Sequence, residues 1–188
     1  MSLQLSPRSQ RLRSRKAEFT HQIIVFRLRQ EWFALPIQAA QKVIPLGKVY
    51  GAGAGSAIGL TLYQDREIPL LDIQQRIFGT ATQALLTGNP SPPKQNASHV
   101  DPFSLGRFLL LVQTVTGATI GFPLDAQPML RRVPESAFTP LSATYLTQGQ
   151  LRCVKCLIIP APEQPPIFLL NLDQLLQTQS ALPHAAGD

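Results

Sequence analysis

The sequence is poor in cysteine and in charge. Of its 188 residues only Cys153 and Cys156 are cysteines, and 15% are charged, against about a quarter in an average soluble domain. Two cysteines are too few for a disulfide scaffold. Hydrophobic residues make up 44%, which excludes a wholly disordered chain, and 17 scattered prolines argue against a long helical bundle. We therefore expect a β-rich globule, either one domain or two small fused units, in a reducing cytoplasm.

An obvious membrane-inserting segment is also missing. The residues after Met1 contain no apolar stretch of the kind that a secretory signal needs. The longest apolar run, 108–124, has 17 residues without a charge, close to the roughly 20 that span a bilayer. Polar residues, Gly117 and Pro123 interrupt this run. We therefore expect a two-stranded hairpin that turns at Thr116–Gly117, and no membrane span.

The net charge of +6 is concentrated at the N-terminus. Residues 1–18 hold five cations and one anion, which leaves 12 cations and 10 anions for the rest of the chain. We expect residues 1–20 to form a solvated basic tail. An electrostatic foothold on an acidic partner or surface, and an organellar transit sequence, remain open alternatives. No aromatic residue lies among these arginines, so base stacking has no platform and no nucleic-acid partner is expected.

Short apolar runs separated by polar turns predict strands along most of the remaining chain. A first hairpin is expected over residues 23–28 and 32–37 and a second over 58–63 and 66–71, the latter with a tight turn at Gln64–Asp65.

Other segments are predicted to be short helices or loops. Residues 38–44 are expected to make a turn or two of helix against a sheet. Residues 72–78 are expected to form a helix whose N-cap is Asp72. Residues 79–106, rich in Gly, Pro, Ser and Asn, predict a flexible insertion, and 178–188 a C-terminal tail.

The second half of the chain repeats the first. Residues 68–77 align with 167–176, each a strand, an Asp or Asn cap and a short amphipathic helix, and residues 34–37 align with 121–124. In each case the hairpin end is expected to be followed by a segment that could be helical. The repeat predicts two similar β-units that share a core, each too small to be stable alone. Many short strands with few helices favour barrels or sandwiches.

The C-x-x-C pair formed by Cys153 and Cys156 is the strongest candidate for chemistry. Flanking Arg152 and Lys155 could favour a thiolate, so a redox or metal-linked protein is an alternative reading of the chain. Zinc needs about four ligands, however, and the three histidines lack ligand spacing. At most one of the two cysteines is expected to point inward, and no metal or cofactor is expected.

Other candidate motifs favour structural interpretations. Residues 51–55, Gly-Ala-Gly-Ala-Gly, lack the rest of a phosphate-binding motif and predict a surface loop. The carboxylates lie at turns and caps rather than in pairs, so an enzyme is not expected. Arg131 and Arg132 are expected in a solvated loop, and Trp32 beside Phe33 indicates one core ring and one partly exposed ring.

The ordered set of motifs resembles the CheW-like domain, a scaffold family of bacterial chemosensory arrays. The residues that carry this resemblance are Ile24–Leu28, Trp32–Ile37, Val43–Ile44, Gly59, Ile68–Asp72, Phe122–Asp125, Ser142–Leu146 and Phe168–Asp173. It covers about residues 21–177, which would form a single domain. It implies an all-β dominated fold of two intertwined, SH3-like, five-stranded barrel subdomains around a shared hydrophobic core, with a few short helices.

The resemblance also implies a function and a site. Members of the family are noncatalytic adaptors that couple a methyl-accepting receptor to a CheA-like histidine kinase, using exposed strands for the kinase and a groove between the subdomains for the receptor. Ala39, Ala40 and Val43 match the segment that lines the groove. The receptor-reading turn of the family matches residues 62–65, but Gln64 and Asp65 stand where the family has arginine and glycine.

A glutamine cannot supply the fixed charge and donor fork of an arginine. We therefore expect Arg66, helped by Gln64 and next to Tyr63 and Asp65, to have taken over a partner contact. Strand alternation would place Gln64 and Arg66 on one face. A solvated hairpin role for Arg66 remains the alternative.

The basic head, the 79–106 insertion and the Gln-rich helices indicate a divergent member of the family. It resembles most closely the members that serve phototaxis and type IV pilus motility, the PixI type. This narrower resemblance adds a photoreceptor and a response regulator to the expected partners, and a cytoplasmic location at membrane-bound receptor arrays.

Overall fold

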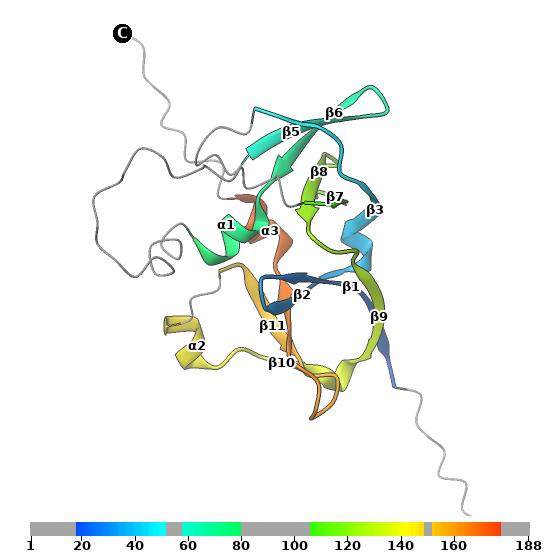
Figure 1. Cartoon of the computed structure of the whole chain (residues 1–188). Coiled ribbons are helices and arrows are strands. Elements are labelled where there is room, and N and C mark those ends of the chain that lie inside the picture. The colour runs from blue at the N-terminus through cyan, green and yellow to red at the C-terminus, as the bar shows by residue number, and fades with distance from the viewer. Residues whose placement is uncertain (1–17, 52–57, 80–105, 149–151, 178–188) are drawn as a thin grey trace, which may run out of the picture.

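The chain folds into two six-stranded sheets that lie one above the other (Figure 1). A computed structural model describes residues 18–51, 58–79, 106–148 and 152–177, so the predicted basic tail up to residue 17, most of the 79–106 insertion and the 178–188 tail lie outside the described residues. Sheet A contains, in spatial order, β10 (Phe138–Thr139), β11 (Val154–Ile158), β12 (Ile167–Leu170), β2 (Glu31–Pro36), β1 (Thr20–Leu28) and β9 (Met129–Pro134). Sheet B contains β4 (Val49–Tyr50), β5 (Ile58–Tyr63), β6 (Arg66–Leu71), β8 (Thr119–Leu124), β7 (Phe108–Gln113) and β3 (Ala40–Pro45).

Five short helices complete the described fold. They are η1 (Ile37–Ala39), α1 (Ile73–Phe78), η3 (Glu135–Ala137), α2 (Ala143–Gln148) and α3 (Leu172–Gln177). Helices α1 and α3 contact each other and lie at the level where the two sheets meet (Figure 1). None of the helices in the described ranges is long and apolar enough to cross a bilayer.

The two sheets contain equivalent strands in the same order, but each sheet draws on both halves of the chain. Hairpin β1–β2 of the first repeat pairs with β12 and β9 of the second, and hairpin β7–β8 of the second pairs with β6 and β3 of the first. The register is also repeated: Ala34 lies opposite Leu169 in sheet A, and Gly121 lies opposite Leu70 in sheet B. The two β-units expected from the repeat therefore do not correspond to successive halves.

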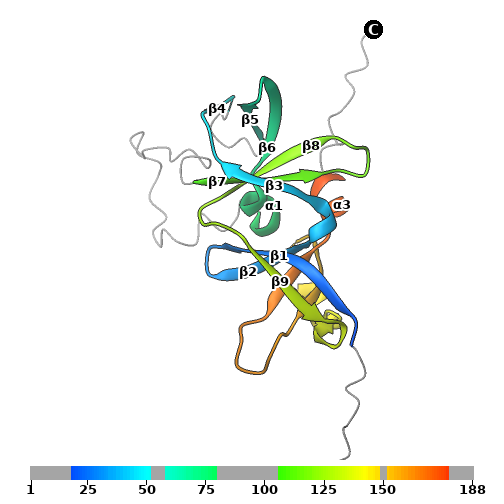
Figure 2. The same ribbon diagram turned by 90° about the vertical axis from the view of Figure 1, so that its right-hand side faces the viewer.

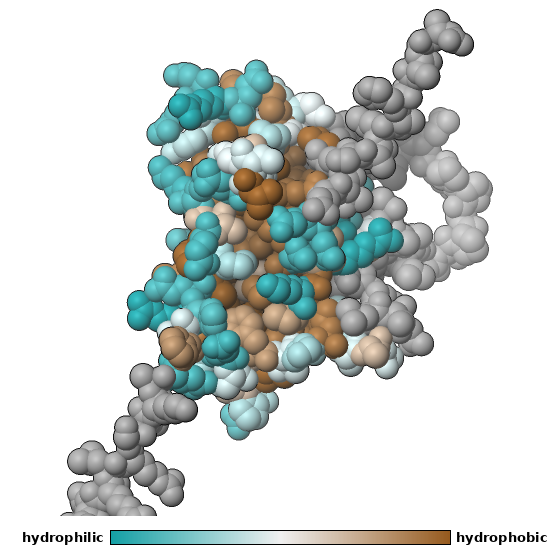
Figure 3. Space-filling view, turned by 180° about the vertical axis from the view of Figure 1, so that it is seen from behind, coloured by the Kyte–Doolittle hydropathy of each residue, from teal (hydrophilic) through white to brown (hydrophobic). Residues whose placement is uncertain are grey.

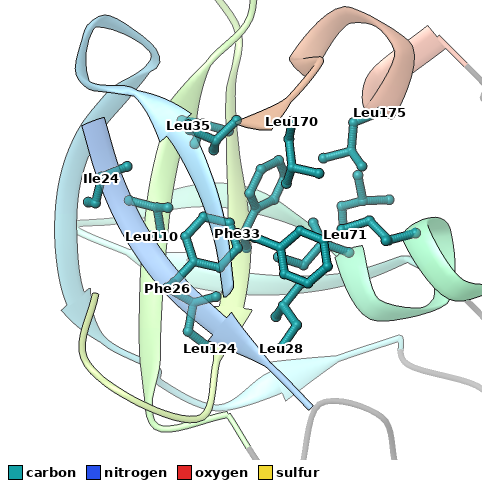
Figure 4. Packing of buried hydrophobic residues seen from close by; sticks show 14 residues of the cluster. Ile24, Phe26, Leu28, Phe33, Leu35, Leu71, Leu110, Leu124, Leu170 and Leu175 are labelled. Carbon is teal, nitrogen blue, oxygen red and sulfur yellow. The ribbon is translucent and has the colours of Figure 1, made fainter. Parts of the chain in front are cut away.

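The exchanged strands are buried on both faces. In β1, Ile23 and Val25 face a core inside sheet A, while Ile24 and Phe26 face a larger core that both sheets share. The shared core also holds Phe33, and Figure 4 shows it packed among leucines from both sheets. Burial on both faces explains why these strands are continuously apolar instead of alternating with polar residues.

The same explanation applies to the apolar run 108–124. It forms the predicted hairpin, with β7 and β8 joined by a turn in which Gly117 has a φ of 85°. Leu109 and Leu111 face the core inside sheet B, whereas Leu110 and Val112 face the shared core. A length close to that of a membrane span therefore results from a hairpin that is buried on two sides.

Several predicted elements are confirmed. The first hairpin turns at Arg29–Gln30 and the second at Gln64–Asp65. Asp72 caps α1 by accepting a hydrogen bond from the Gln75 N–H at 3.1 Å. Its equivalent in the repeat, Asn171, caps α3 in the same way, at 3.2 Å from the N–H of Gln174. Trp32 is half-buried and Phe33 is fully buried, as predicted for that pair.

Three predictions were wrong. Residues 40–45 form strand β3 instead of a helical turn, because pairing with β7 satisfies more backbone groups than one turn of helix can. Arg131 and Arg132 lie in strand β9, paired with β1, rather than in a loop. The segment after residue 124 bends into β9 and contains no helix, unlike η1 after the first hairpin.

Exchange of the hairpins predicts that neither half of the chain folds alone. We expect fragments 1–92 and 93–188 to be unfolded separately, because each lacks the strands that flank its own hairpin, and to recover native circular dichroism when mixed. Cooperative unfolding of either fragment alone would contradict this expectation.

Gly121 is predicted to be intolerant of a side chain at the exchanged pairing. A Cβ there would lie 2.6 Å from Leu109 Cδ1 and 2.8 Å from Leu70 Cδ2. We expect Gly121→Ala to lower the free energy of unfolding by about 1–3 kcal/mol, measured by denaturant titration. Gly47→Ala is the control, since its Cβ would meet only Thr61 Oγ1 at 3.5 Å. Equal stability of the two variants would refute the close packing.

Candidate partner-binding surface

The predicted site residues Ala39, Ala40 and Val43 lie in η1 and on β3, at one edge of sheet B. Ala40 and Val43 pack against the shared core and are half-buried, as is Ala39. Between them Gln41 and Lys42 are exposed, and a register shift at Gln41 marks a β-bulge. A bulge at an edge turns side chains away from simple alternation. This edge therefore presents polar side chains above a partly buried apolar wall.

Lys42 joins this edge to the second part of the predicted site. Its Nζ donates a hydrogen bond to Tyr63 Oη at 2.8 Å and lies 5.5 Å from the centroid of the Tyr63 ring. Tyr63 in turn packs against the core inside sheet B. Strand β3 and the β5–β6 hairpin, far apart in sequence, are thus held together by one cation and one phenol. No sequence pattern pointed to Lys42, because residues 38–44 were predicted to be helical.

The turn that follows Tyr63 differs from the expected geometry. Gln64 and Asp65 have φ angles of 52° and 60°, so both occupy the left-handed region of a type I′ hairpin turn. Both are exposed, and Arg66, the first residue of β6, lies directly opposite Tyr63. The prediction that Gln64 and Arg66 share a strand face was wrong, because Gln64 lies in the turn, where alternation does not hold. Among the described residues Arg66 has no acidic partner within ion-pair distance.

Strand β9 is the equivalent edge of sheet A, and the sequence did not reveal it as a surface. Met129 and Leu130 are 42% and 60% exposed on this strand. Figures 1 and 2 place β3 and β9 on the same side of the molecule, one on each sheet. We call this side, defined by β3, β9 and the 63–66 turn, the edge surface. The sequence drew attention to Arg131 and Arg132, but it predicted a loop there. These residues form a strand because β9 pairs with β1.

Charge and apolar groups are mixed at the protein surface. In Figure 3, seen from behind, hydrophilic side chains gather along the left margin, on the side where Figure 1 places β3 and β9, and apolar residues are visible beside them. The 63–66 turn and its flank contribute both signs, with Lys42 and Arg66 near Asp65 and Glu67. Mixed charge beside apolar groups suits recognition of a protein partner.

Asp72 has a structural role as the cap of α1. Burial raises the pKa of Asp72, although its hydrogen bonds to the backbone of α1 and the nearby Arg29 act in the opposite direction. Burial also raises the pKa of Asp125. Within the described part of the chain, no three His, Cys, Asp or Glu side chains gather into a group that could hold a metal.

The two cysteines contact different cores. Cys153 packs against the shared core and Cys156 against the core inside sheet A, and both are half-buried free thiols. The expectation that at most one points inward was wrong, because both sides of sheet A lie against apolar clusters and each thiol contacts one of them. Burial raises the pKa of both thiols despite the neighbouring cations. Their environment thus disfavours the thiolate that redox chemistry requires.

The raised pKa values predict slow alkylation. At about pH 8 both thiols should react with iodoacetamide more slowly in the folded protein than in the urea-unfolded chain, because less thiolate is present. The rate in the folded protein should rise as pH increases, with a midpoint above that of the unfolded chain, measured by mass spectrometry. Faster reaction of either thiol in the folded protein would restore the redox alternative.

The fold agrees with comparisons to known proteins. The CheW-like domain family matches residues 22–180. The crystal structure of the scaffolding protein TtCheW from Thermoanaerobacter tengcongensis is similar, with a TM-score of 0.59 and 16% sequence identity over 86% of this chain and 90% of that one. None of the curated proteins matches in sequence. At this identity the structural likeness shows the fold, two SH3-like subdomains, while the family match covers most of the sequence. The chain belongs to the CheW-like domain family.

Proposed function

We propose that this protein is a noncatalytic adaptor that couples a methyl-accepting chemosensory receptor to a CheA-like histidine kinase. Members of the CheW-like family are noncatalytic scaffold proteins. The observation that carries the proposal is the presence of separate open sheet edges on one body whose two sheets exchange hairpins. An adaptor must hold two partners in a fixed relation, and exchanged strands prevent the sheets from moving independently.

The receptor is assigned to the edge surface. Ala39, Ala40 and Val43 supply an apolar wall, and the 63–66 turn lies beside it through the contact between Lys42 and Tyr63. Arg66 is exposed and has no ion pair among the described residues, so its charge is available to a partner. Gln64 and Asp65 at the tip of the turn would supply further polar contacts. This arrangement replaces the missing arginine of the family turn with a cation two positions later.

The kinase is assigned to the opposite edge of sheet B. Strand β4 ends the sheet there, with Tyr50 43% exposed, and Leu62 on the adjacent β5 is 56% exposed. An open strand edge can pair with a strand of a partner, whose backbone supplies affinity while side chains supply choice. The receptor and kinase would then bind different edges and would not compete.

We also propose a narrower role of the PixI type, in phototaxis or pilus-driven motility. The altered 63–66 turn supports a receptor that differs from the usual one, such as a photoreceptor, and a response regulator as an additional partner. The protein would work in the cytoplasm and be recruited to membrane-bound receptor arrays through its partners.

Simultaneous binding tests the adaptor role. The receptor and the kinase are first recovered from the native host by affinity capture. We then expect the full chain to form a ternary complex with the cytoplasmic fragment of the receptor and the kinase domain, measured by analytical ultracentrifugation. Competition between receptor and kinase for the chain would refute the assignment to separate edges.

Arg66 is expected to contact the receptor. Arg66→Ala should weaken receptor binding by about 1–3 kcal/mol, because a charged hydrogen bond is lost, while it changes folding stability by less than about 0.5 kcal/mol. Isothermal titration calorimetry measures the first quantity and denaturant titration the second. Lys155→Ala, an exposed cation on β11, is the matched control and should leave affinity unchanged. An Arg66→Ala affinity equal to that of the control would remove Arg66 from the site.

A further inference from the structure

The repeat allows the same surface to be compared on the two sheets. On sheet A, Phe168 of β12 lies opposite Leu157 of β11, and on sheet B the equivalent Pro69 lies opposite Leu60. Tyr145 of α2 covers the sheet A position, with its ring stacked on that of Phe168 at 6.3 Å between centroids and 25° between planes. A helix of this chain therefore covers the face at Phe168.

Helix α2 has no equivalent in the described part of sheet B. It lies in the connection between β10 and β11, residues 140–153, whereas the connection between β4 and β5 is residues 51–57, half that length. The side chains below the position are also smaller on sheet B. Pro69 stands where sheet A has Phe168, and Ile120 stands where it has Phe33, whose ring lies 5.5 Å from that of Phe168. Among the described residues, the smaller side chains and the lack of an α2 equivalent leave space at this position.

A small pocket lies there. It has a volume of about 90 Å³ and is lined only by apolar residues: Ile58, Pro69, Leu70, Leu71, Ile120 and Leu176. Ile58 is 43% exposed at its rim, and Leu62, on the same face of β5, is 56% exposed. Exposed apolar side chains that lead to an apolar pocket are typical of a protein-binding surface with one buried anchor.

We propose that this pocket binds one large apolar side chain of an amphipathic helix from a partner protein, in the place that Tyr145 takes on sheet A. The template for the occupant is α2 itself, which places an aromatic ring on the equivalent face. Ile58 and Leu62 are four residues apart on a strand, roughly 13 Å. A helix of two to three turns spans that distance, so one anchor can enter the pocket while a second covers Leu62. The surface is distinct from the edge surface but shares Leu62 with the edge assigned above to the kinase. The pocket itself lies outside both surfaces, and the inference does not rest on the adaptor role.

The test uses two probes on the full chain. The first is p-cresol, the side-chain analogue of tyrosine, followed by methyl NMR signals of Ile58, Ile120 and Leu176. The second is a 14-residue amphipathic peptide, locked as a helix by a side-chain crosslink on its polar face, with one tyrosine on its apolar face. Its matched control carries alanine for that tyrosine. We expect saturable shifts of the pocket methyl groups with both probes, and affinity lower by about tenfold or more for the alanine peptide.

Variants locate the binding. Pro69→Phe restores the ring found at the equivalent position of sheet A and should abolish binding of both probes without loss of thermal stability. Leu62→Glu should weaken only the peptide, whereas Val115→Glu, an 88% exposed apolar position in the β7–β8 turn, should leave both unchanged. Should Pro69→Phe fail to fold, Leu62→Glu and the alanine peptide still decide the question.

Three results would overturn the proposal. The first is the absence of saturable shifts with p-cresol, and the second is binding of p-cresol without binding of the peptide. The third concerns residues 178–188 of this chain, which follow directly after α3. If the peptide binds only when the chain ends at residue 177, the occupant of the pocket is the chain's own C-terminal segment and not a partner helix.

Discussion

Two parallel strand pairings, β2 with β12 and β8 with β6, determine the rest of this structure. Each joins a hairpin of one repeat to the last strand of the other, with Ala34 opposite Leu169 and Gly121 opposite Leu70. A parallel pair cannot be closed by a tight turn, so its strands must come from distant parts of the chain. The exchange buries β1, β2, β7 and β8 on both faces and creates the shared core between the sheets.

The same constraint suits the proposed role of an adaptor. Hairpins exchanged in both directions place the edges β3 and β9 on one side of a single body, and leave β4 and β10 as the other ends of the sheets. Among the described residues, the repeats differ in what surrounds the equivalent strands and in some side chains on those strands. Helix α2 covers Phe168 on sheet A, whereas Pro69 lines an apolar pocket on sheet B.

The sequence predicted those parts of the fold that depend on local pattern. The hairpins, the Asp72 cap and the repeat follow from apolar runs, turn residues and spacing. The exchange of hairpins could not be predicted, because β2 has the same pattern whether it pairs within its own repeat or with the other one. The contact between Lys42 and Tyr63 joins residues 21 positions apart, and β3 is a strand only because β7 lies beside it. The exposed Met129 on β9 was missed for the same reason.

Native-state hydrogen exchange tests the central claim, that the exchanged hairpins make the two sheets one cooperative unit. Amides of β1 and β2 in sheet A, and of β7 and β8 in sheet B, should all open with the same free energy, equal to that of global unfolding. Denaturant should lower these free energies in parallel. The claim would be contradicted if the slowest amides of one sheet opened with a lower free energy than global unfolding while those of the other sheet remained protected.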